Sequence, residues 1–498
     1  MICTNVESKS VVVLTLFLFF ANPLYSQNLF FENIKTLNLN YQSIIKKDGE
    51  VKGYFFIHEK DTTDNYIDTY KFTIVDTDLS IKSEKDIMVS EETSVFQSSC
   101  NGSEIVILFF HADAKTLEYQ IYDLNGILKL GYTINVSGKE FRQYKKIALD
   151  GADNIKFKGI DHIDSSGFIS NTLYLDKNVS SISINFYSTK KNHQWSYVPK
   201  NGGSYFFGEY LGTAKNIIYL HLVSFKGSIY TDLPEVFIIG IDLKTGKELF
   251  KRSANSKFKI LAKGLKILED GEAYLYGAYY DKGADINKDK ALGFALWKMY
   301  ENGDINEEKY ISWQKDFKDY LEVSKNGKIS GIGYIYFQNI VQHSNNEFYI
   351  LGEGHQKVFN SLGLISSLLN GVLLANGLIF GLNGDFIKEV TTDIIIIKLD
   401  SNYKIKDVVV YEKKNSNLSD YNGTEMNKSD SSISFLYLSN KTFALNSIKV
   451  NNEGITTEKI KANPSATKSK VFFTSNQQKL ILNYFKSSKR MEVGFQKI

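Results

Sequence analysis

Cysteine, proline and arginine are scarce in this chain of 498 residues, and each shortage excludes a class of protein. Two cysteines cannot hold a disulfide-rich scaffold, and four prolines exclude collagen-like and proline-rich sequences. The arginines are Arg142, Arg252 and Arg490, whereas lysines alternate with Asp and Glu along the whole chain. Nucleic-acid-binding proteins usually gather basic residues on one face and use the planar arginine fork, so we expect no nucleic-acid partner. With 43% hydrophobic and 23% charged residues, the chain is typical neither of disorder nor of a polytopic membrane protein.

The N-terminus has the pattern of a secretory signal peptide. Lys9 precedes an apolar stretch at residues 11–21, which is followed by Pro23 and the small residue Ser26. A stretch this short cannot span a bilayer as a helix, so we expect cleavage near Ser26 rather than a retained anchor. The sequence therefore predicts a signal peptide at residues 1–26 and a secreted, periplasmic or cell-surface protein.

Cleavage would remove Cys3 and leave Cys100 as the single cysteine, which cannot form an internal disulfide. A large exported protein without disulfides is more typical of a bacterial envelope than of a eukaryotic extracellular space. Neither a histidine nor a basic cluster lies near Cys100 in the sequence, so we interpret it as a packed thiol rather than a nucleophile.

After residue 27 the dominant pattern is that of short β-strands. Aromatic residues make up 14% of the chain and stand among Ile and Val in short runs, such as residues 104–110 and 216–223. Seven runs end in an acidic or amide residue and then turn, which is the chemistry of a β-hairpin. These residues are Asp76, Asp123, Asp176, Asp242, Glu301, Asp400 and Asn451.

A second pattern, an aromatic and two apolar residues followed by Gly, recurs at residues 205–208, 274–277 and 349–352. Two patterns that recur in the same order indicate a repeat architecture. The strand that ends in Gly352-Glu353, with the later Asp393-Ile-Ile-Ile-Ile-Lys398-Leu-Asp400, resembles the blade repeats of uncharacterised secreted bacterial β-propellers. This resemblance covers about residues 40–498, brings no catalytic residues, and implies four-stranded blades around a central channel.

We therefore predict an all-β fold, a β-propeller of about seven four-stranded blades over residues 27–498, with a hydrophobic helical insert at residues 357–385. The alternative is two or more antiparallel domains that are split near residues 200–203, where Lys-Asn-Gly-Gly could form a break.

A short helix is predicted at residues 312–326, where aromatic and apolar residues recur at helical spacing after a possible N-cap, Ser312. Its apolar positions are Trp313, Phe317, Tyr320 and Leu321.

The insert contains an uncharged segment at residues 362–382, which predicts one or two helices with a broad apolar face. Such a segment could be buried in the core or over the channel, dock on a partner or membrane surface, or span a bilayer. If it docks, the expected contact residues are Leu364, Leu368, Val372 and Phe380.

The best metal candidate is the alternation of Asp285, Asn287 and Asp289, whose oxygens could converge on calcium as at the start of a calcium loop. Lys290 replaces the glycine and Leu296 the glutamate that such loops carry, and the alternative is an ordinary solvated loop.

Glycan chemistry is the other candidate. Glu209 and Glu353 could belong to an acid–base pair, and Trp195 and Tyr197 could stack on sugar rings or simply pack between blades. The sequence contains no nucleophile elbow, phosphate loop, zinc-binding helix or Cys-x-x-Cys pair.

The sequence thus favours an exported, non-enzymatic binding or scaffold protein of the bacterial envelope, with a protein or glycan partner and no cofactor other than the calcium candidate. The alternatives are a secreted hydrolase or lyase that acts on glycans at the channel mouth, and a membrane-associated protein held by residues 362–382.

Overall fold

The computed structural model describes residues 28–497 with gaps. The gaps are residues 39–40, 62–66, 151–158, 164, 177–178, 190–193, 200–204, 227–232, 234, 256, 268–272, 286–288, 325–326, 344–346, 356–390, 413–420, 428–431, 440–443, 452–453, 461–462, 464 and 475–477.

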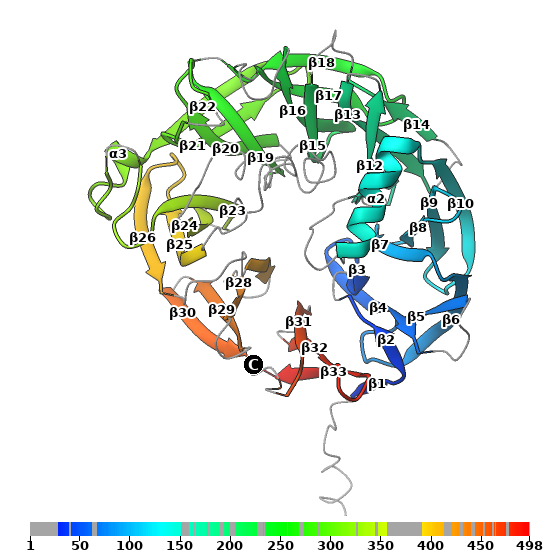
Figure 1. Cartoon of the computed structure of the whole chain (residues 1–498). Helices are drawn as coiled ribbons and strands as arrows, with labels where there is room; N and C mark the ends of the chain where they lie inside the picture. The colour runs from blue at the N-terminus through cyan, green and yellow to red at the C-terminus, as the bar shows by residue number, and fades with distance from the viewer. Residues whose placement is uncertain are drawn as a thin grey trace, which may run out of the picture.

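The described residues form eight antiparallel sheets that lie side by side in a ring (Figure 1). We call each sheet a blade, and its strands run in order from the centre of the ring to the rim. The predicted β-propeller is confirmed, with one sheet more than the seven hairpins counted in the sequence.

The first four blades follow the chain from the centre outward. Blade 1 contains β3 (Ser43–Lys47), β4 (Glu50–Lys60), β5 (Ile67–Val75) and β6 (Ile81–Ser90), with the short β2 (Ile34–Thr36) also on β4. Blade 2 contains β7 (Thr93–Cys100), β8 (Glu104–His111), β9 (Thr116–Asp123) and β10 (Leu128–Asn135). Blade 3 contains β11 (Ile160–Ile163), β12 (Gly167–Asp176), β13 (Val179–Ser188) and β14 (Gln194–Tyr197). Blade 4 contains β15 (Tyr205–Ala214), β16 (Ile217–Phe225), β17 (Glu235–Asp242) and β18 (Glu248–Ser253).

The next three blades repeat this order, and the eighth departs from it. Blade 5 contains β19 (Lys259–Ile267), β20 (Ala273–Tyr280), β21 (Gly293–Met299) and β22 (Ile305–Ser312). Blade 6 contains β23 (Tyr334–Gln342), β24 (Phe348–His355), β25 (Thr391–Leu399) and β26 (Ile405–Tyr411). Blade 7 contains β27 (Tyr421–Asn427), β28 (Ser432–Ser439), β29 (Ala444–Asn451) and β30 (Gly454–Ile460). Blade 8 contains β31 (Lys468–Phe473), β32 (Gln478–Phe485) and β33 (Arg490–Lys497), and its fourth strand is β1 (Leu29–Phe31).

The two ends of the chain therefore meet in one blade. β1 pairs antiparallel with β33, with Leu29 opposite Val493 and Phe31 opposite Met491. The chain then crosses to blade 1, where β2 pairs with β4. Strands from both ends of the chain thus join the first blade to the last.

Among the described residues, apolar clusters fill the spaces between neighbouring blades from blade 8 through blade 1 to blade 7. The cluster between blades 8 and 1 buries Phe31 and Met491 with Phe56 of β4 and Leu482 of β32. Another cluster runs from blade 2 to blade 4 and contains side chains on both sides of residue 200. The strands between two such clusters are apolar on both faces, as in β8, where all residues except His111 are buried.

Six of the seven predicted hairpin turns lie at equivalent places, between the third and fourth strands of blades 1, 2, 4, 5, 6 and 7. At Asp123, Asp242 and Asp400 the side-chain carboxylate holds the turn. Asp400 Oδ1, for example, accepts hydrogen bonds from the amides of Asn402 and Lys404, both at 2.9 Å. The seventh, at Asp176, lies between the second and third strands of blade 3.

The three aromatic–Gly segments are not equivalent, which corrects the repeat inferred from them. Residues 274–277 and 349–352 lie on second strands, and their glycines face β-bulges in the first strands. A Cβ on Gly277 would lie 2.1 Å from the Leu261 carbonyl oxygen, so only glycine fits there. Residues 205–208 instead open a first strand, β15. In six of the eight blades a bulge interrupts the pairing of the first and second strands.

Within the described ranges, two helices accompany the blades. α2 (Gly138–Asp150) begins after Ser137, whose hydroxyl bonds to Glu140, and it buries Tyr144 against blade 2. α3 (Trp313–Asp316) is a single turn with Ser312 as its N-cap. The longer helix predicted over residues 312–326 is therefore wrong beyond Asp316, where the chain continues in turns. The predicted insert at 357–385, with residues 362–382, lies outside the described residues.

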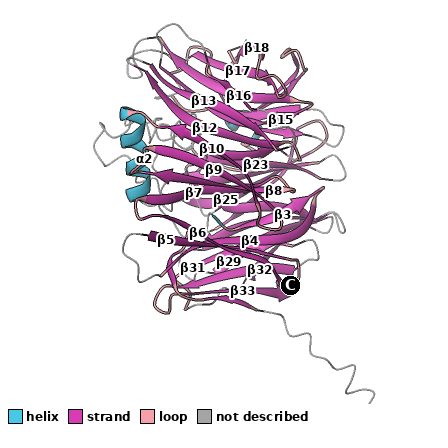
Figure 2. Cartoon of the chain, turned by 90° about the vertical axis from the view of Figure 1, so that its right-hand side faces the viewer, coloured by secondary structure: helices cyan, strands magenta, loops and turns pink. Residues whose placement is uncertain are grey.

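The connections divide the ring into two faces, because consecutive strands run antiparallel. Turns from first to second and from third to fourth strands, such as residues 215–216 and 300–304, lie on what we call the short-turn face. The other connections lie on the opposite, long-connection face, and Figure 2 shows α2 there at one side of the ring. They include the connections from β10 to β11, from β20 to β21 and from β22 to β23.

Replacing Phe31 by Ala should lower the free energy of unfolding by about 3–5 kcal/mol, because Phe31 is 4% exposed and packs where blades 1 and 8 meet. Phe30 is the matched control, because it is on the same strand but 46% exposed, and Phe30→Ala should cost less than about 1 kcal/mol. Urea unfolding of both variants measures the difference, and equal losses would contradict the role given to this contact.

His221 should make the protein less stable in acid. Its ring is fully buried, has no hydrogen-bond partner among the described residues, and its pKa is lowered to about 3 by burial. The unfolded chain protonates a histidine near pH 6.5. The stability that the neutral His221 ring gives the folded protein is therefore complete above that pH and is lost as the pH falls towards 3. Between pH 7 and pH 5 the loss should be on the order of 2 kcal/mol. His221→Leu should flatten the pH profile of unfolding by that amount, and parallel profiles would refute the assignment.

Candidate functional site

A cavity of about 760 Å³ opens on the long-connection face of blade 5. Its walls come from the residue before β19, the end of β20, the connection between β20 and β21, and the start of α3. This volume is within the range of small-molecule sites. The lining residues are Phe258, Tyr279, Asp281, Gly283, Ala284, Asp289, Lys290, Ala291, Leu292, Ser312, Trp313, Gln314, Lys315 and Gly327.

Packed aromatic rings form the apolar wall of this pocket. The half-buried Phe258 ring lies 4.9 Å from Tyr279 and 4.8 Å from Tyr310, measured between ring centroids, and the Lys257 ammonium lies 5.4 Å from its centroid. Trp313 stacks on Phe337 of blade 6 at 5.3 Å, and its amide donates to the Leu292 carbonyl. These contacts hold the wall in place from several elements at once.

The rim of the pocket is polar and partly unengaged. Asp281, Gln314 and Lys315 are exposed, and their side chains make no hydrogen bond or ion pair within the described part of the chain. Burial raises the pKa of Tyr279, so this side chain stays a neutral hydroxyl that can donate a hydrogen bond. One apolar wall is therefore surrounded by groups that only accept hydrogen bonds, groups that only donate them, and groups that do both.

The predicted calcium residues belong to the same connection. Asp289 is exposed on the pocket and accepts a hydrogen bond from the Asp285 amide at 2.7 Å, while Asn287 lies outside the described residues. Lys259 is 2% exposed and donates to the Ala284 carbonyl oxygen beneath this loop. Burial lowers the pKa of Lys259, and the charges of Asp285 and Asp289 raise it. The ammonium of Lys259 thus already supplies a positive charge beside this loop. Within the described residues no group of three or more His, Cys, Asp or Glu side chains could hold a metal.

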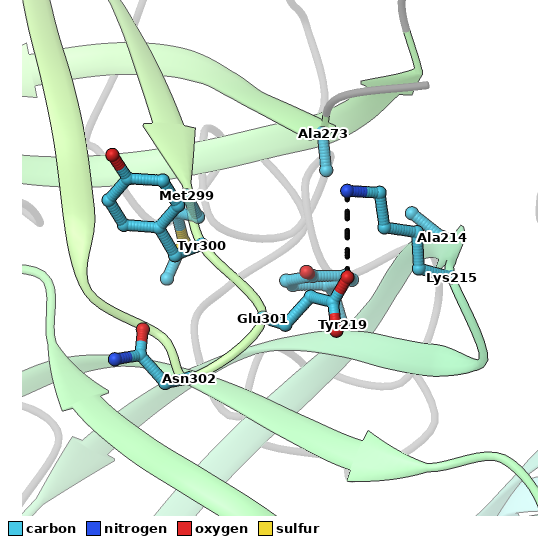
Figure 3. A pocket seen from close by; sticks show the side chains of 8 residues that line it. All are labelled: Ala214, Lys215, Tyr219, Ala273, Met299, Tyr300, Glu301 and Asn302. Carbon is cyan, nitrogen blue, oxygen red and sulfur yellow. Dashed lines mark ion pairs between the residues drawn. The ribbon is translucent and has the colours of Figure 1, made fainter. Parts of the chain in front are cut away.

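A second cavity, of about 360 Å³, lies on the short-turn face between blades 4 and 5 (Figure 3). Lys215 and Glu301 line it and form an ion pair, with Nζ and Oε1 3.5 Å apart, and the Tyr219 ring lies beside them. Burial and then the charge of Glu301 raise the pKa of Tyr219 to about 12. The two charged groups of this cavity already neutralise each other.

The glycan candidates do not gather at one site. Glu353 is fully buried, which removes it from contact with a glycan, and the side chain of Glu209 is not described. Trp195 donates from Nε1 to the Leu243 carbonyl of blade 4, and Tyr197 bonds to Glu248. Both side chains thus pack between blades, as the simpler interpretation expected.

The remaining predicted residues can be placed briefly. Cys100 is buried at the end of β7, and its sulfur accepts a hydrogen bond from the Gly102 amide. Within the described residues no helix is both long and apolar enough to cross a membrane. The predicted contact residues lie in the segment that is not described, namely Leu364, Leu368, Val372 and Phe380.

The family model of DUF6770, a family of unknown function, matches residues 7–436. The chain belongs to this family. No curated protein matches the sequence.

Solved structures with a similar arrangement share little sequence with this DUF6770 chain. The β-propeller domain of the Trilobed protease from Pyrococcus furiosus has 10% identity and a TM-score of 0.39, over 84% of this chain and 97% of that one. A DUF4221 family member from Bacteroides vulgatus has 10% identity and a TM-score of 0.31, over 94% and 96%. A prolyl endopeptidase has 8% identity and a TM-score of 0.40 over 91% of this chain, which spans only 54% of that protein. Likenesses at such identities concern the fold alone.

Calcium should not raise the melting temperature of the protein, because Lys259 already supplies positive charge beside Asp285 and Asp289. Thermal unfolding with millimolar calcium and with EDTA measures this. A rise that Asp289→Asn abolishes would instead establish the calcium site.

Proposed function

We propose that this DUF6770 protein is an exported β-propeller of the bacterial envelope that binds a ligand or partner at its long-connection face and catalyses no reaction. The observation that carries the proposal is the pocket of blade 5, where Asp281, Gln314 and Lys315 surround an aromatic wall without engaging other described side chains.

The contrast between the two faces supports this choice. A ligand that bonds to Lys215 or Glu301 in the short-turn cavity would compete with the ion pair that these two side chains already form (Figure 3). Asp281, Gln314 and Lys315 at the blade 5 pocket have no such bond to lose, because only water has to leave them. Longer connections also gather on that face, and binding residues commonly stand on loops that a rigid scaffold holds.

The rigidity of the scaffold is a further argument. Trp313 begins α3, contacts Phe317 at 4.9 Å and stacks on Phe337 of the next blade. Lys315 and Gln314 follow Trp313 directly, so the packing of one buried ring fixes the backbone of two rim residues. A preorganised rim loses little conformational freedom when a ligand binds.

Export is consistent with the position of the first strand. The expected cleavage after Ser26 lies three residues before Leu29, where β1 begins. Removal of residues 1–26 would therefore leave every described strand of the ring intact.

Charge reversal on each face tests the proposal. Lys315→Glu should reduce retention of a partner from the envelope fraction of the source cells at least tenfold, since a hydrogen bond to a charged group contributes about 1.5–3 kcal/mol. Lys215→Glu, on the opposite face, should leave retention unchanged. Quantitative mass spectrometry of proteins and glycans eluted from the immobilised mature protein measures both.

N-terminal sequencing of the natural protein from that fraction should begin at Gln27. Equal loss of retention with both charge reversals, or a bound partner that is cleaved or otherwise turned over, would contradict the proposal.

A further inference from the structure

The charges that line the blade 5 pocket balance. Its two carboxylates, Asp281 and Asp289, stand against two ammonium groups, Lys290 and Lys315. The Lys290 ammonium also lies 5.0 Å from the centroid of the Tyr334 ring. A phosphate or other anion would meet two carboxylates here, and a metal ion would meet two lysines, so the lining favours a ligand without net charge.

The polar groups of the rim select further among uncharged ligands. Asp281 only accepts hydrogen bonds, Lys315 only donates them, and Gln314 does both. A ligand that satisfies all three must itself carry several groups that donate and accept. Hydroxyl groups do this, whereas a purely apolar ligand would leave the rim desolvated and unpaired.

The aromatic wall adds the last requirement. Phe258 is half-buried and presents an apolar surface beside the rim, and it is held by Tyr279 and Tyr310. A matching ligand therefore needs an apolar patch next to its hydroxyl groups. Sugar rings combine these features, with C–H groups on their faces and hydroxyl groups at their edges.

We propose that the blade 5 pocket binds a neutral saccharide, with a C–H face against Phe258 and hydroxyl groups on Asp281, Gln314 and Lys315. This inference rests on the proposed function, because it names the ligand class of the same face.

A peptide is the main competitor, and the walls of the pocket favour it less. One common way in which an extended peptide binds is by adding a strand to a sheet edge. The pocket includes only the last residue of the edge strand β22, Ser312, whose amide donates to Asp316 at 2.6 Å. The other walls are connections and inner strands, so the pocket offers a peptide backbone no ladder to extend.

Isothermal titration calorimetry of the mature protein tests the inference. The probes are neutral oligosaccharides of hexoses, pentoses and N-acetylhexosamines, with uncharged pentapeptides as comparators. One saccharide class should bind. Asp281→Ala and Gln314→Ala should each weaken that binding about tenfold, since each removes hydrogen bonds to ligand hydroxyl groups. Phe258→Leu keeps the core filled but removes the ring, and it should also weaken binding.

Lys215→Ala is the matched control on the short-turn face and should bind the saccharide as the natural protein does. Melting temperatures of all variants, compared with that of the natural protein, show that each one is folded. Saccharide binding that Asp281→Ala, Gln314→Ala and Phe258→Leu all leave unchanged would overturn the site.

Binding of the peptides alone, or of none of the probes, would overturn the ligand class. If Lys315→Glu still abolished retention of an envelope partner, the proposed function would stand without its saccharide. If no variant on the long-connection face affected any binding, the proposed function and the saccharide inference would both be wrong.

Discussion

Blades 1, 2, 4, 5 and 6 each lie between two apolar clusters, and that constraint governs the rest of the structure. A sheet with two apolar faces is stable only when a neighbour covers each of them. The clusters between blades 8 and 1, 1 and 2, and 4 and 5 show how this is met: every one draws side chains from two adjacent sheets. A row of such blades would expose an apolar face at each end, so the row has to bend into a ring and meet itself.

In the ring, the residues that stabilise the fold lie apart from the connections that vary. Its core lies between blades and along the strands, where bulges next to residues such as Gly277 let the first strand bend. The turns between third and fourth strands are alike in blades 1, 2, 4, 5 and 6, and each carries a residue with positive φ at the same position, namely Leu79, Gly126, Gly246, Gly303 and Tyr403. The opposite face is where connections differ in length, and there the chain can vary without disturbing the clusters.

The fold was predictable because its signals are local. An acidic residue at the end of an apolar strand predicts a hairpin from the chemistry of a few neighbouring residues, and Asp123 and Asp400 hold their turns in that way. The number of blades was harder to infer, because blade 3 has its acidic turn at a different place and blade 8 takes its fourth strand from the N-terminus. The helix α2 could have been found from Ser137 and Glu140, which form a capping box ahead of Phe141 and Tyr144.

The pocket was not predictable, since its parts have no common motif. Phe258, Asp281 and Lys315 come from three separate connections and meet only because blade 5 folds back and forth between them. Asp285 and Asp289 were visible in the sequence as an alternation of oxygen ligands. The buried cation beside them, Lys259, lies on another strand and follows no ligand pattern that the sequence could reveal.

The pairing of the two chain ends has a consequence for how the protein reaches its native state. Asn28 and Glu492 are 464 residues apart, yet their side chains touch beside the paired strands β1 and β33. Contacts of such long sequence separation form late and slow the rate of folding. Synthesis therefore has to reach β33, at Arg490–Lys497, before the first strand finds its partner. A chain that is released early by a ribosome, or cut by a protease near its C-terminus, would have a β1 strand without its partner and a last blade with an exposed edge. Such a chain would be prone to aggregation and to degradation by cellular quality control.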